Sequence, residues 1–341
     1  MSMSGSTVKG YAALSVGQPL VPFAYTAPLL GDHDIRVSVT HCGLCFSDIH
    51  AIDDLYAVTT YPFVPGHEIV GSVMEIGSSV TGFQMGDRVG IGWQGRSCGT
   101  CEWCRHGEEQ LCNDVATNGV WIPYGGFATS VVADSRFAYL LPDEMPAEDV
   151  AVLLCAGITV YNGLIRNRTT DDQKIGIIGI GGLGHLAIQF AHAMGYHVTV
   201  LSSSGSKRDE AMAFGSDRFI CTAEKGTLSD QNETFDLMFC TAHGDVHWEP
   251  LMEAMKKHGK LIMMGFANMK FNPTDLVVHE LTIQGSFVGN RATMREMLDF
   301  ANQHHIKPVV ELMPMSRINE AIDLIKENKA RYRIVLVNDI L

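Results

Sequence analysis

The chain has 341 residues, of which 46% are hydrophobic and 18% are charged, and its formal net charge is −13. This length predicts two domains, and the composition allows buried cores and excludes a disordered chain. The acidic balance argues against nucleic-acid binding, which needs a cationic face. The most apolar stretches, 150–164 and 175–188, are too short to cross a membrane, and the N-terminus lacks the apolar core of a signal peptide. We therefore expect a cytoplasmic protein that binds neither nucleic acid nor a membrane.

Two patterns follow one another along the chain. The first 150 residues are rich in glycine, proline and short β-branched runs (35–40, 69–76 and 88–91), which predicts an irregular β-domain. From residue 151 the pattern changes to alternating strands and helices, which predicts a doubly wound parallel sheet. The strands are expected at 174–179, 197–202, 235–240 and 260–265, with helices over 183–194 and 248–257. The tail from residue 289 predicts helices over 293–303 and 316–328 and a last strand at 333–337.

A glycine-rich loop joins the first strand and helix of the second pattern. The residues Gly179, Gly181, Gly182, Leu183 and Gly184 give the spacing G-x-G-x-x-G. The first glycine permits a tight turn, the second a close approach to a pyrophosphate, and the last close packing of helix on strand. The helix N-terminus then offers N–H groups to phosphates. An ordinary glycine-rich turn is the alternative, and the strand–loop–helix setting favours a dinucleotide site.

The end of the next strand bears on which dinucleotide binds. An NAD-binding protein usually has an acid there, which holds the ribose 2′-hydroxyl. This chain has Ser202, Ser203 and Ser204, followed by Lys207. Small hydroxyls and a cation suit a 2′-phosphate, which an acid would repel. The serines could equally cap the following helix, but the set favours NADP.

Four of the nine cysteines are clustered in one loop with the spacing C-x2-C-x2-C-x7-C: Cys98, Cys101, Cys104 and Cys112. An odd total in an unsecreted chain suits metal binding better than disulfides. Four thiolates in a short loop can surround zinc and leave no open position, which is a structural site. Thiolates would also hold an iron–sulfur cluster. Zinc is favoured because nicotinamide chemistry needs no electron-transfer cluster.

A second candidate metal set is dispersed along the chain. Cys45 lies in CGLCFSDIH, His67 and Glu68 lie in PGHE, and Cys155 lies in LLCAGITVYNGL. Two thiolates and one imidazole have the composition of an open, catalytic zinc site, whose fourth position takes water or substrate. Each residue taken alone is more often part of a packed core, and spacing alone does not join them.

These motifs, in this order, resemble a known family. The chain is similar to the zinc-dependent alcohol dehydrogenases of the medium-chain dehydrogenase/reductase superfamily, and especially to their cinnamyl-alcohol-dehydrogenase-like, NADP-preferring branch. The resemblance runs through CGLCFSDIH, PFVPGHEIVG, GDRVGIGW, the four-cysteine loop, CAGITVYNGL, GIGGLG, SFVGNR and ARYRIVLVN. It implies an α/β protein with a GroES-like irregular β-barrel catalytic domain, residues 1–150 completed by 289–341, and a Rossmann domain, residues 151–288. It also implies a homodimer or homotetramer with two zinc ions and NADP per chain.

The resemblance implies a role for each residue of the dispersed set. Cys45, His67 and Cys155 would ligate the catalytic zinc. Glu68 would lie near the metal and would ligate it transiently while water and substrate exchange. Asp48 would orient His67, as metal-bound imidazoles require.

The resemblance also implies a proton path and a set of cofactor contacts. Ser47 would pass a proton from the alcohol to the cofactor ribose and on to His50, which meets solvent. Arg331 or Arg333 would contact the pyrophosphate, and Phe46 departs from the cationic residue usual at its position. Nicotinamide contacts are implied for Thr159, Gly265, Ser286 and Phe287.

We therefore expect hydride transfer between nicotinamide C4 and a primary alcohol or aldehyde that zinc activates. Aldehyde reduction is the expected direction. One alternative is an NAD-linked polyol or secondary-alcohol dehydrogenase of the same superfamily. The other is a non-enzymatic zinc- and nucleotide-binding protein, which could have lost Ser47, His50 or Cys155 without penalty.

Overall fold

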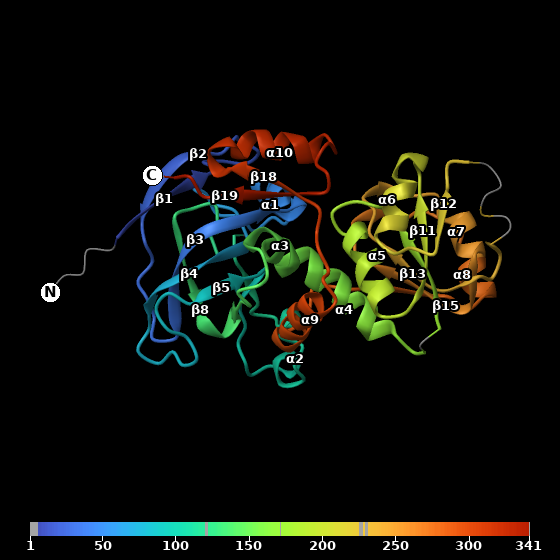
Figure 1. Cartoon of the computed structure of the whole chain (residues 1–341), viewed down its shortest axis with the longest axis horizontal. Helices are drawn as coiled ribbons and strands as arrows, with labels where there is room; N and C mark the ends of the chain where they lie inside the picture. Colours follow the sequence, from blue (N-terminus) through green and yellow to red (C-terminus); the bar gives the residue numbers. More distant parts are fainter. Residues whose placement is uncertain (1–5, 120–121, 171, 225–227, 229–230, 341) are drawn as a thin grey trace. The chain divides into compact units, whose positions relative to one another are not determined.

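The computed structural model describes residues 6–119, 122–170, 172–224, 228 and 231–340. The chain divides into two compact units (Figure 1). The first unit comprises the residues up to Cys155, the segment Asn290–Leu298 and the residues from Pro308 onward. The second unit comprises Ala156–Gly289 and Asp299–Lys307.

The first unit is built on a mostly antiparallel sheet of seven strands. The strand order is β18-β19-β3-β4-β5-β9, and β8 pairs with β3. These strands are β3 (Asp34–Leu44), β4 (Glu68–Ile76), β5 (Arg88–Ile91), β8 (Ser130–Asp134), β9 (Ala138–Leu140), β18 (Val310–Pro314) and β19 (Arg333–Val337). The strands expected at 35–40, 69–76, 88–91 and 333–337 are confirmed. Because β19 pairs with β3, from Ile334 opposite Leu44 to Val337 opposite His41, the end of the chain completes this sheet.

Shorter elements surround this sheet. They are β1 (Thr7–Ala12), β2 (Val21–Thr26), α1 (Phe46–Ile52), β6 (Gln94–Arg96), α2 (Glu102–Arg105), β7 (Ala116–Thr117), α3 (Ala147–Val152) and α10 (Ile318–Lys326). The central strand β3 buries Ile35, Val37 and Val39. Its register with β4 shifts after Arg36 and again after Val39. Such irregularities bend a strand and increase its twist, which suits an irregular barrel.

The second unit contains a six-stranded parallel sheet in the order β12-β11-β10-β13-β15-β17. The strands are β10 (Lys174–Ile178), β11 (His197–Ser202), β12 (Arg218–Cys221), β13 (Phe235–Cys240), β15 (Met255–Met263) and β17 (Thr282–Gly285). Helices α5 (Gly184–Ala193) and α6 (Arg208–Ala213) lie on one side, and α7 (Glu249–Glu253) and α8 (Thr274–Val278) lie on the other (Figure 1). The strand order reverses between β10 and β13, and ligands of such sheets bind at that switch point, beyond the carboxyl ends of the strands. The predicted doubly wound sheet is confirmed.

One expected helix is shorter than the sequence pattern predicts. We expected a helix over 248–257, but α7 ends at Glu253 and β15 already begins at Met255. The reason is tertiary, because Met255 pairs with Phe235 on β13 and its side chain is buried there. Apolar residues at this spacing suit either a helix face or a buried strand, and sheet pairing decided between them.

Within the described residues, one helical run, Ala147–Asn167, is long and apolar enough to cross a membrane, but 78% of its most apolar window is buried inside the protein. It consists of α3, a π-helical turn (Leu153–Gly157) and α4 (Ile158–Asn167). A π-helical turn inserts an extra residue into a helix and often marks a functional position. Cys155 lies in this turn.

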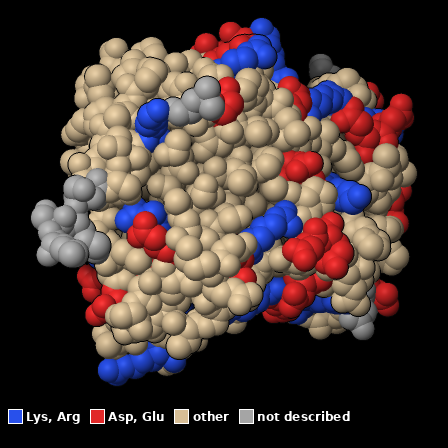
Figure 2. All heavy atoms as spheres, turned by 60° about the vertical axis from the view of Figure 1, so that its left-hand side comes forward, with Lys and Arg blue, Asp and Glu red and all other residues tan. Residues whose placement is uncertain are grey.

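Charged side chains of both signs are interspersed on the face drawn in Figure 2, with a broad uncharged area between them. A nucleic-acid-binding face would instead gather lysine and arginine into one patch. The net charge of −13 belongs to the whole chain, and the face in Figure 2 carries charges of both signs without a basic patch.

Candidate functional site

The start of helix α1 positions the first member of the dispersed set. Cys45 is the residue before the helix, and its Sγ accepts a hydrogen bond from the Ser47 backbone N–H at 3.5 Å. The Asp48 side chain closes the cap, because its Oδ2 accepts from the Cys45 N–H at 2.9 Å. A thiolate at this position is stabilised by the N–H groups and the dipole of the helix start.

Asp48 also fixes His67. Its Oδ1 lies 2.9 Å from His67 Nδ1 and 3.0 Å from the Gly66 nitrogen, and both side chains are fully buried. A carboxylate can only accept hydrogen bonds, so Nδ1 of His67 carries the proton. The lone pair of Nε2 then points away from Asp48. His67 Nε2 is buried and has no hydrogen-bond partner within the part of the chain that the structure describes.

The structure brings all four predicted residues of this set together. One ligand atom from each of Cys45, His67, Glu68 and Cys155 lies within 4.8 Å of the others. The two sulfurs are 3.9 Å apart and not bonded. Tetrahedral zinc with bonds of about 2.3 Å to sulfur would hold two sulfurs about 3.8 Å apart. The donor set, the sulfur spacing and the unpartnered nitrogen therefore fit a zinc ion.

The two thiols of this site differ in acidity. The hydrogen bond from Cys155 holds the pKa of Cys45 well below its usual value, against burial, which opposes ionisation. The same hydrogen bond and burial hold the pKa of Cys155 well above its usual value. The two sulfurs therefore share a proton in this hydrogen bond, and a zinc ion, which binds thiolates, would take the place of that proton.

Glu68 is held at the edge of this set by Arg333. The Arg333 guanidinium forms a buried ion pair with Glu68 Oε1, while Oε2 is buried without a hydrogen-bond partner among the described residues. Burial raises the pKa of Glu68 to about 7, although Arg333 opposes this rise. Of the two arginines proposed for the pyrophosphate, Arg333 is thus committed to Glu68, whereas Arg331 is exposed and packs over the Tyr332 ring.

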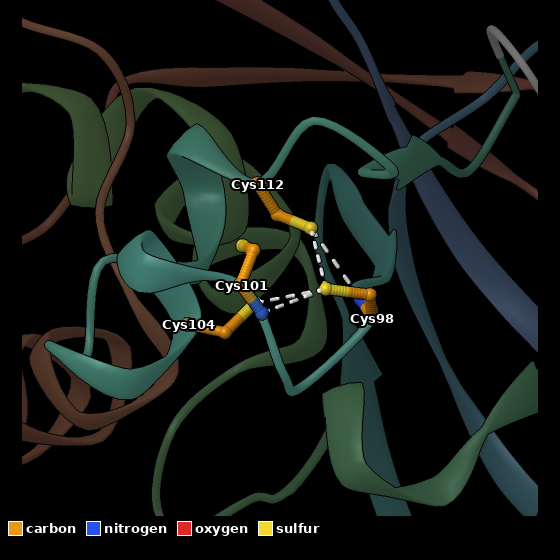
Figure 3. A group of neighbouring side chains, drawn as sticks. All are labelled: Cys98, Cys101, Cys104 and Cys112. Atoms are coloured by element: carbon orange, nitrogen blue, oxygen red, sulfur yellow. Dashed lines mark hydrogen bonds between the residues drawn. The ribbon is translucent and has the colours of Figure 1, made fainter.

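The four-cysteine loop is a second metal-binding group (Figure 3). Cys98 Sγ lies 3.9 Å from Cys104 Sγ and 3.5 Å from Cys112 Sγ, and all four cysteines are free thiols whose sulfurs lie within 4.8 Å of one another. Backbone N–H groups of Thr100 and Cys101 donate to Cys98 Sγ, and with the Thr100 hydroxyl they lower its pKa to about 6. Sulfurs this close suit one tetrahedral ion, because an iron–sulfur cluster would place several atoms between them.

The start of helix α9 (Arg291–Gln303) is bound to this loop within the first unit. Arg291 donates from its backbone N–H and from Nε to Glu109 Oε1, at 3.0 and 2.7 Å. Asn290 donates to the Gly107 carbonyl at 2.6 Å. Asn290 also caps α9, because its Oδ1 accepts from the Thr293 N–H at 2.7 Å. The anchoring of the loop was missed, because no local signal marks it.

The expected relay residues lie on α1. Ser47 and His50 are both half-buried, and His50 packs against the edge of Phe46 with ring centroids 5.4 Å apart. His50 Nδ1 lies 3.4 Å from the hydroxyl of Tyr56. Sequence reasoning did not single out Tyr56, because it lies beyond the helix and belongs to none of the motifs.

The glycine loop of the second unit is shaped for close approach. Gly179 has φ of +94°, the left-handed conformation that the turn requires. A Cβ at Gly184 would overlap the Gly179 carbonyl oxygen, whereas a Cβ at Gly181 would meet nothing within 4 Å. The protein itself therefore requires a glycine at 184 but not at 181, which fits a ligand that approaches the backbone at Gly181. Gly182 and Leu183, which completes the turn before α5, are half-buried beside it.

The serine turn after β11 contains the helix cap that the sequence offered as one alternative. Ser204 caps the short helical turn that follows, since its Oγ accepts from the Ser206 N–H at 3.3 Å. Ser202 Oγ donates to the Ser204 carbonyl, and Ser203 is exposed. Lys207 reaches back from this turn and donates to the Ile180 carbonyl at 2.8 Å. A cation therefore lies on the glycine loop itself.

The residues expected near the nicotinamide also lie in the second unit. Thr159 is buried on α4. Gly265 follows β15, where a Cβ would overlap the Ala242 carbonyl oxygen. Ser286 and Phe287 follow β17, and the Phe287 carbonyl accepts from the Asn162 side chain at 3.4 Å. The positions at the carboxyl ends of these strands suit a dinucleotide site.

A zinc-compatible pair of cysteine sulfurs with a buried imidazole, together with a dinucleotide-type parallel sheet, defines a dehydrogenase with a metal centre. Family comparisons agree with this class. The alcohol dehydrogenase GroES-like domain matches residues 31–143, and the zinc-binding dehydrogenase domain matches residues 182–303.

Whole-chain relatives specify the family. A probable cinnamyl alcohol dehydrogenase 1 from Nicotiana tabacum is 38% identical over 97% of this chain and 95% of its own length. A cinnamyl alcohol dehydrogenase structure from Sorghum bicolor has a TM-score of 0.90 and 35% identity, and covers 97% of this chain and 98% of its own. A Helicobacter pylori structure, described as CAD complexed with NADP(H), has a TM-score of 0.88 and 28% identity, with 97% and 98% coverage. The chain belongs to the zinc-dependent alcohol dehydrogenases of the medium-chain dehydrogenase/reductase superfamily, among their cinnamyl-alcohol-dehydrogenase-like members.

Proposed function

We propose that this protein is an NADP(H)-linked aldehyde reductase that interconverts a primary alcohol and its aldehyde at a zinc centre. The convergence of Cys45, His67 and Cys155, with His67 Nε2 unpartnered, is the observation that carries the proposal. The zinc would be held by these three residues, with Glu68 within reach. A second zinc would be held by the four-cysteine loop.

When bound, zinc supplies Lewis acidity, which polarises a carbonyl or makes an alcohol more acidic, and NADPH supplies the hydride from C4. The chain's own residues supply orientation and the proton. Asp48 keeps the proton of His67 on Nδ1, so that Nε2 stays available to the metal. Ser47 follows Cys45 by two residues, and its hydroxyl is proposed to exchange a proton with the substrate oxygen.

The proposed preference for NADP(H) rests on the turn after β11. The residues Ser202–Lys207 include no acid that would repel a 2′-phosphate, and Lys207 places a cation on the glycine loop. The Helicobacter pylori relative with NADP(H) supports this assignment. Because cellular NADP pools are mostly reduced, we propose aldehyde reduction as the working direction. We also propose a homodimer or homotetramer, which light scattering would test.

Steady-state kinetics on the zinc-loaded protein would test this function. The panel contains cinnamaldehyde, benzaldehyde, an aliphatic ketone and a sugar alcohol, each with NADPH or NADH as appropriate. We expect aldehydes with NADPH to have the highest kcat/KM and Ser47→Ala to be nearly inactive. Preference for the ketone or the sugar alcohol with the NAD cofactor would instead support the secondary-alcohol or polyol alternative.

Lys207→Ala tests the cofactor assignment separately. Loss of one charge-assisted contact costs about 1.5–3 kcal/mol, so kcat/KM for NADPH should fall about 10- to 100-fold. The value for NADH should change little. Lys174→Ala, which removes an exposed lysine at the start of β10, is the matched control. Equal losses with both cofactors would contradict the assignment of Lys207 to the 2′-phosphate.

A further inference from the structure

We infer that Tyr56 is a further member of the proton path, because its hydroxyl links the Ser47 hydroxyl to the His50 imidazole. The protein would then supply its own hydrogen-bonded route from the substrate oxygen to His50, independent of the cofactor ribose. This inference rests on the proposed function and adds a residue to its machinery.

The first observation is the geometry around the phenol. Tyr56 Oη lies 3.4 Å from His50 Nδ1, and the two rings meet edge to face with centroids 5.9 Å apart. Ser47 also acts on this phenol, because hydrogen bonding with the Ser47 side chain lowers the pKa of Tyr56. All three side chains are half-buried, and Phe46 packs on His50 as well. The contact with His50 is longer than an average hydrogen bond, as catalytic contacts often are before the reactive complex forms.

The second observation is how the chain brings Tyr56 back over α1. After the helix ends, Asp54 and Ala57 adopt positive φ of 50° and 54°, which non-glycine residues rarely do. Asp54 Oδ1 accepts from the backbone N–H groups of Val58 and Thr59 at 3.0 and 2.9 Å. Strained backbone persists only where surrounding contacts hold it, and it clusters at functional sites.

A further hydrogen bond fixes the same loop to the helix. Thr59 Oγ1 donates to the Ala51 carbonyl at 2.8 Å, and the Leu55 N–H donates to the His50 carbonyl at 2.9 Å. Residues before and after Tyr56 in the chain are therefore both hydrogen-bonded to helix α1, which fixes the position of Tyr56. This loop therefore holds the Tyr56 hydroxyl against the His50 imidazole.

Electrostatics keep the phenol in the state that a relay needs. Burial raises the pKa of Tyr56, and the charges of Cys45, Asp48 and Cys155 raise it further, although the hydrogen bond with Ser47 opposes them. A neutral hydroxyl can accept one proton while it gives up another.

The proton steps balance in aldehyde reduction. NADPH would supply the hydride to the carbonyl carbon, and the substrate oxygen would take the Ser47 hydroxyl proton. Ser47 takes the Tyr56 phenol proton, and Tyr56 takes the proton on His50 Nδ1. His50 recovers a proton from solvent, so the net change is one proton and one hydride added to the aldehyde. In alcohol oxidation, each transfer runs in reverse.

The test compares Tyr56→Phe with Tyr61→Phe. Tyr61 is a matched control, because its hydroxyl donates to the Ile52 carbonyl at 2.8 Å, on the same helix, and its removal deletes the same atom. Each zinc-loaded variant is assayed with NADPH and with an analogue that lacks the 2′-hydroxyl of the nicotinamide ribose. The analogue removes the cofactor route, and Tyr56→Phe removes the proposed protein route.

We expect wild type and Tyr61→Phe to tolerate the analogue with less than about a 10-fold loss of kcat, whereas Tyr56→Phe should lose about 100-fold or more with it. The combined loss would exceed the product of the single losses, because either route suffices alone. Equal responses of Tyr56→Phe and Tyr61→Phe to the analogue would overturn the inference and leave the proposed function intact. An inactive wild type would overturn both.

A measurement without cofactor or turnover provides the second readout. In zinc-loaded, cofactor-free protein labelled with ¹⁵N-histidine, the His50 Nδ1 resonance should move in Tyr56→Phe and in Ser47→Ala but not in Tyr61→Phe. A hydroxyl chain transmits both changes to the imidazole, whereas simple ring packing is retained in Tyr56→Phe. An unchanged His50 resonance in Tyr56→Phe would overturn the inference.

Discussion

Replacing Asp48 by asparagine isolates the contribution of one buried carboxylate to the metal site. Asp48 is fully buried and accepts three hydrogen bonds, from Cys45 N, Gly66 N and His67 Nδ1, at 2.9, 3.0 and 2.9 Å. An asparagine of the same shape has only one acceptor oxygen. Either orientation of the amide therefore turns its NH2 group toward at least one buried N–H.

The size of the effect follows from these contacts. Leaving one buried donor unsatisfied costs about 1–3 kcal/mol. The remaining hydrogen bonds lose their charge assistance, which roughly halves their strength. Loss of an oriented partner of a metal-bound imidazole weakens metal binding about 10- to 100-fold. We therefore expect Asp48→Asn to bind the catalytic zinc about 10- to 100-fold more weakly, while the four-cysteine site is unchanged.

Zinc content after dialysis against graded chelator concentrations, measured by mass spectrometry, would show two separate release steps. Only the step of the Cys45 site should move in Asp48→Asn. Asp53→Asn is the control. Asp53 is half-buried at the other end of the same helix, and its carboxylate faces Lys326 at 4.0 Å and not the metal site. Release of both ions at wild-type chelator concentrations would refute the reasoning.

Two further predictions use other parts of the molecule. Gly184→Ala should lower the stability of the second unit by about 1–3 kcal/mol, because the new Cβ would overlap the Gly179 carbonyl oxygen. Gly181→Ala should leave stability unchanged, because its Cβ would meet no protein atom within 4 Å, and should still weaken NADPH binding. Thermal unfolding without cofactor and NADPH titration would check this pair, and equal unfolding temperatures would contradict it. Burial opposes ionisation of Glu109, but its hydrogen bonds to Arg291 outweigh burial and hold the pKa of Glu109 below its usual range. The ion pair therefore contributes stability at neutral pH, and this contribution is lost as the pH falls through the lowered pKa. Glu109→Gln should therefore unfold at lower temperature than wild type at pH 7, with a difference that shrinks in acid, and a constant difference across pH would exclude this account.

Sequence reasoning succeeded where the chemistry is carried by neighbours in the chain. The glycine loop could be predicted because a strand, a turn and a helix follow one another over a few residues. The four-cysteine loop could be predicted because its sulfurs are close in the chain and must be close in space. The boundary of α7 could not, because Met255 joins β15 through a partner strand that begins 20 residues earlier, at Phe235.

The dispersed zinc set was predicted from the motifs around each residue, not from their spacing. Cys45 and Cys155 are 110 residues apart, and nothing local requires their sulfurs to meet. The register of β3 with β4, which places Gly43 opposite Glu68, and the π-helical turn at Cys155 bring these residues together.

The sequence by itself determined the residue types that can hold zinc and cradle a dinucleotide, because composition and short-range spacing specify donors and turns. Only the tertiary structure decided which arginine pairs with Glu68, 265 residues away, and that Tyr56 returns to helix α1 beside His50. The physical reason is that strand register and strained loop conformations are set by packing across the whole unit. Short windows of sequence carry no record of those long-range contacts.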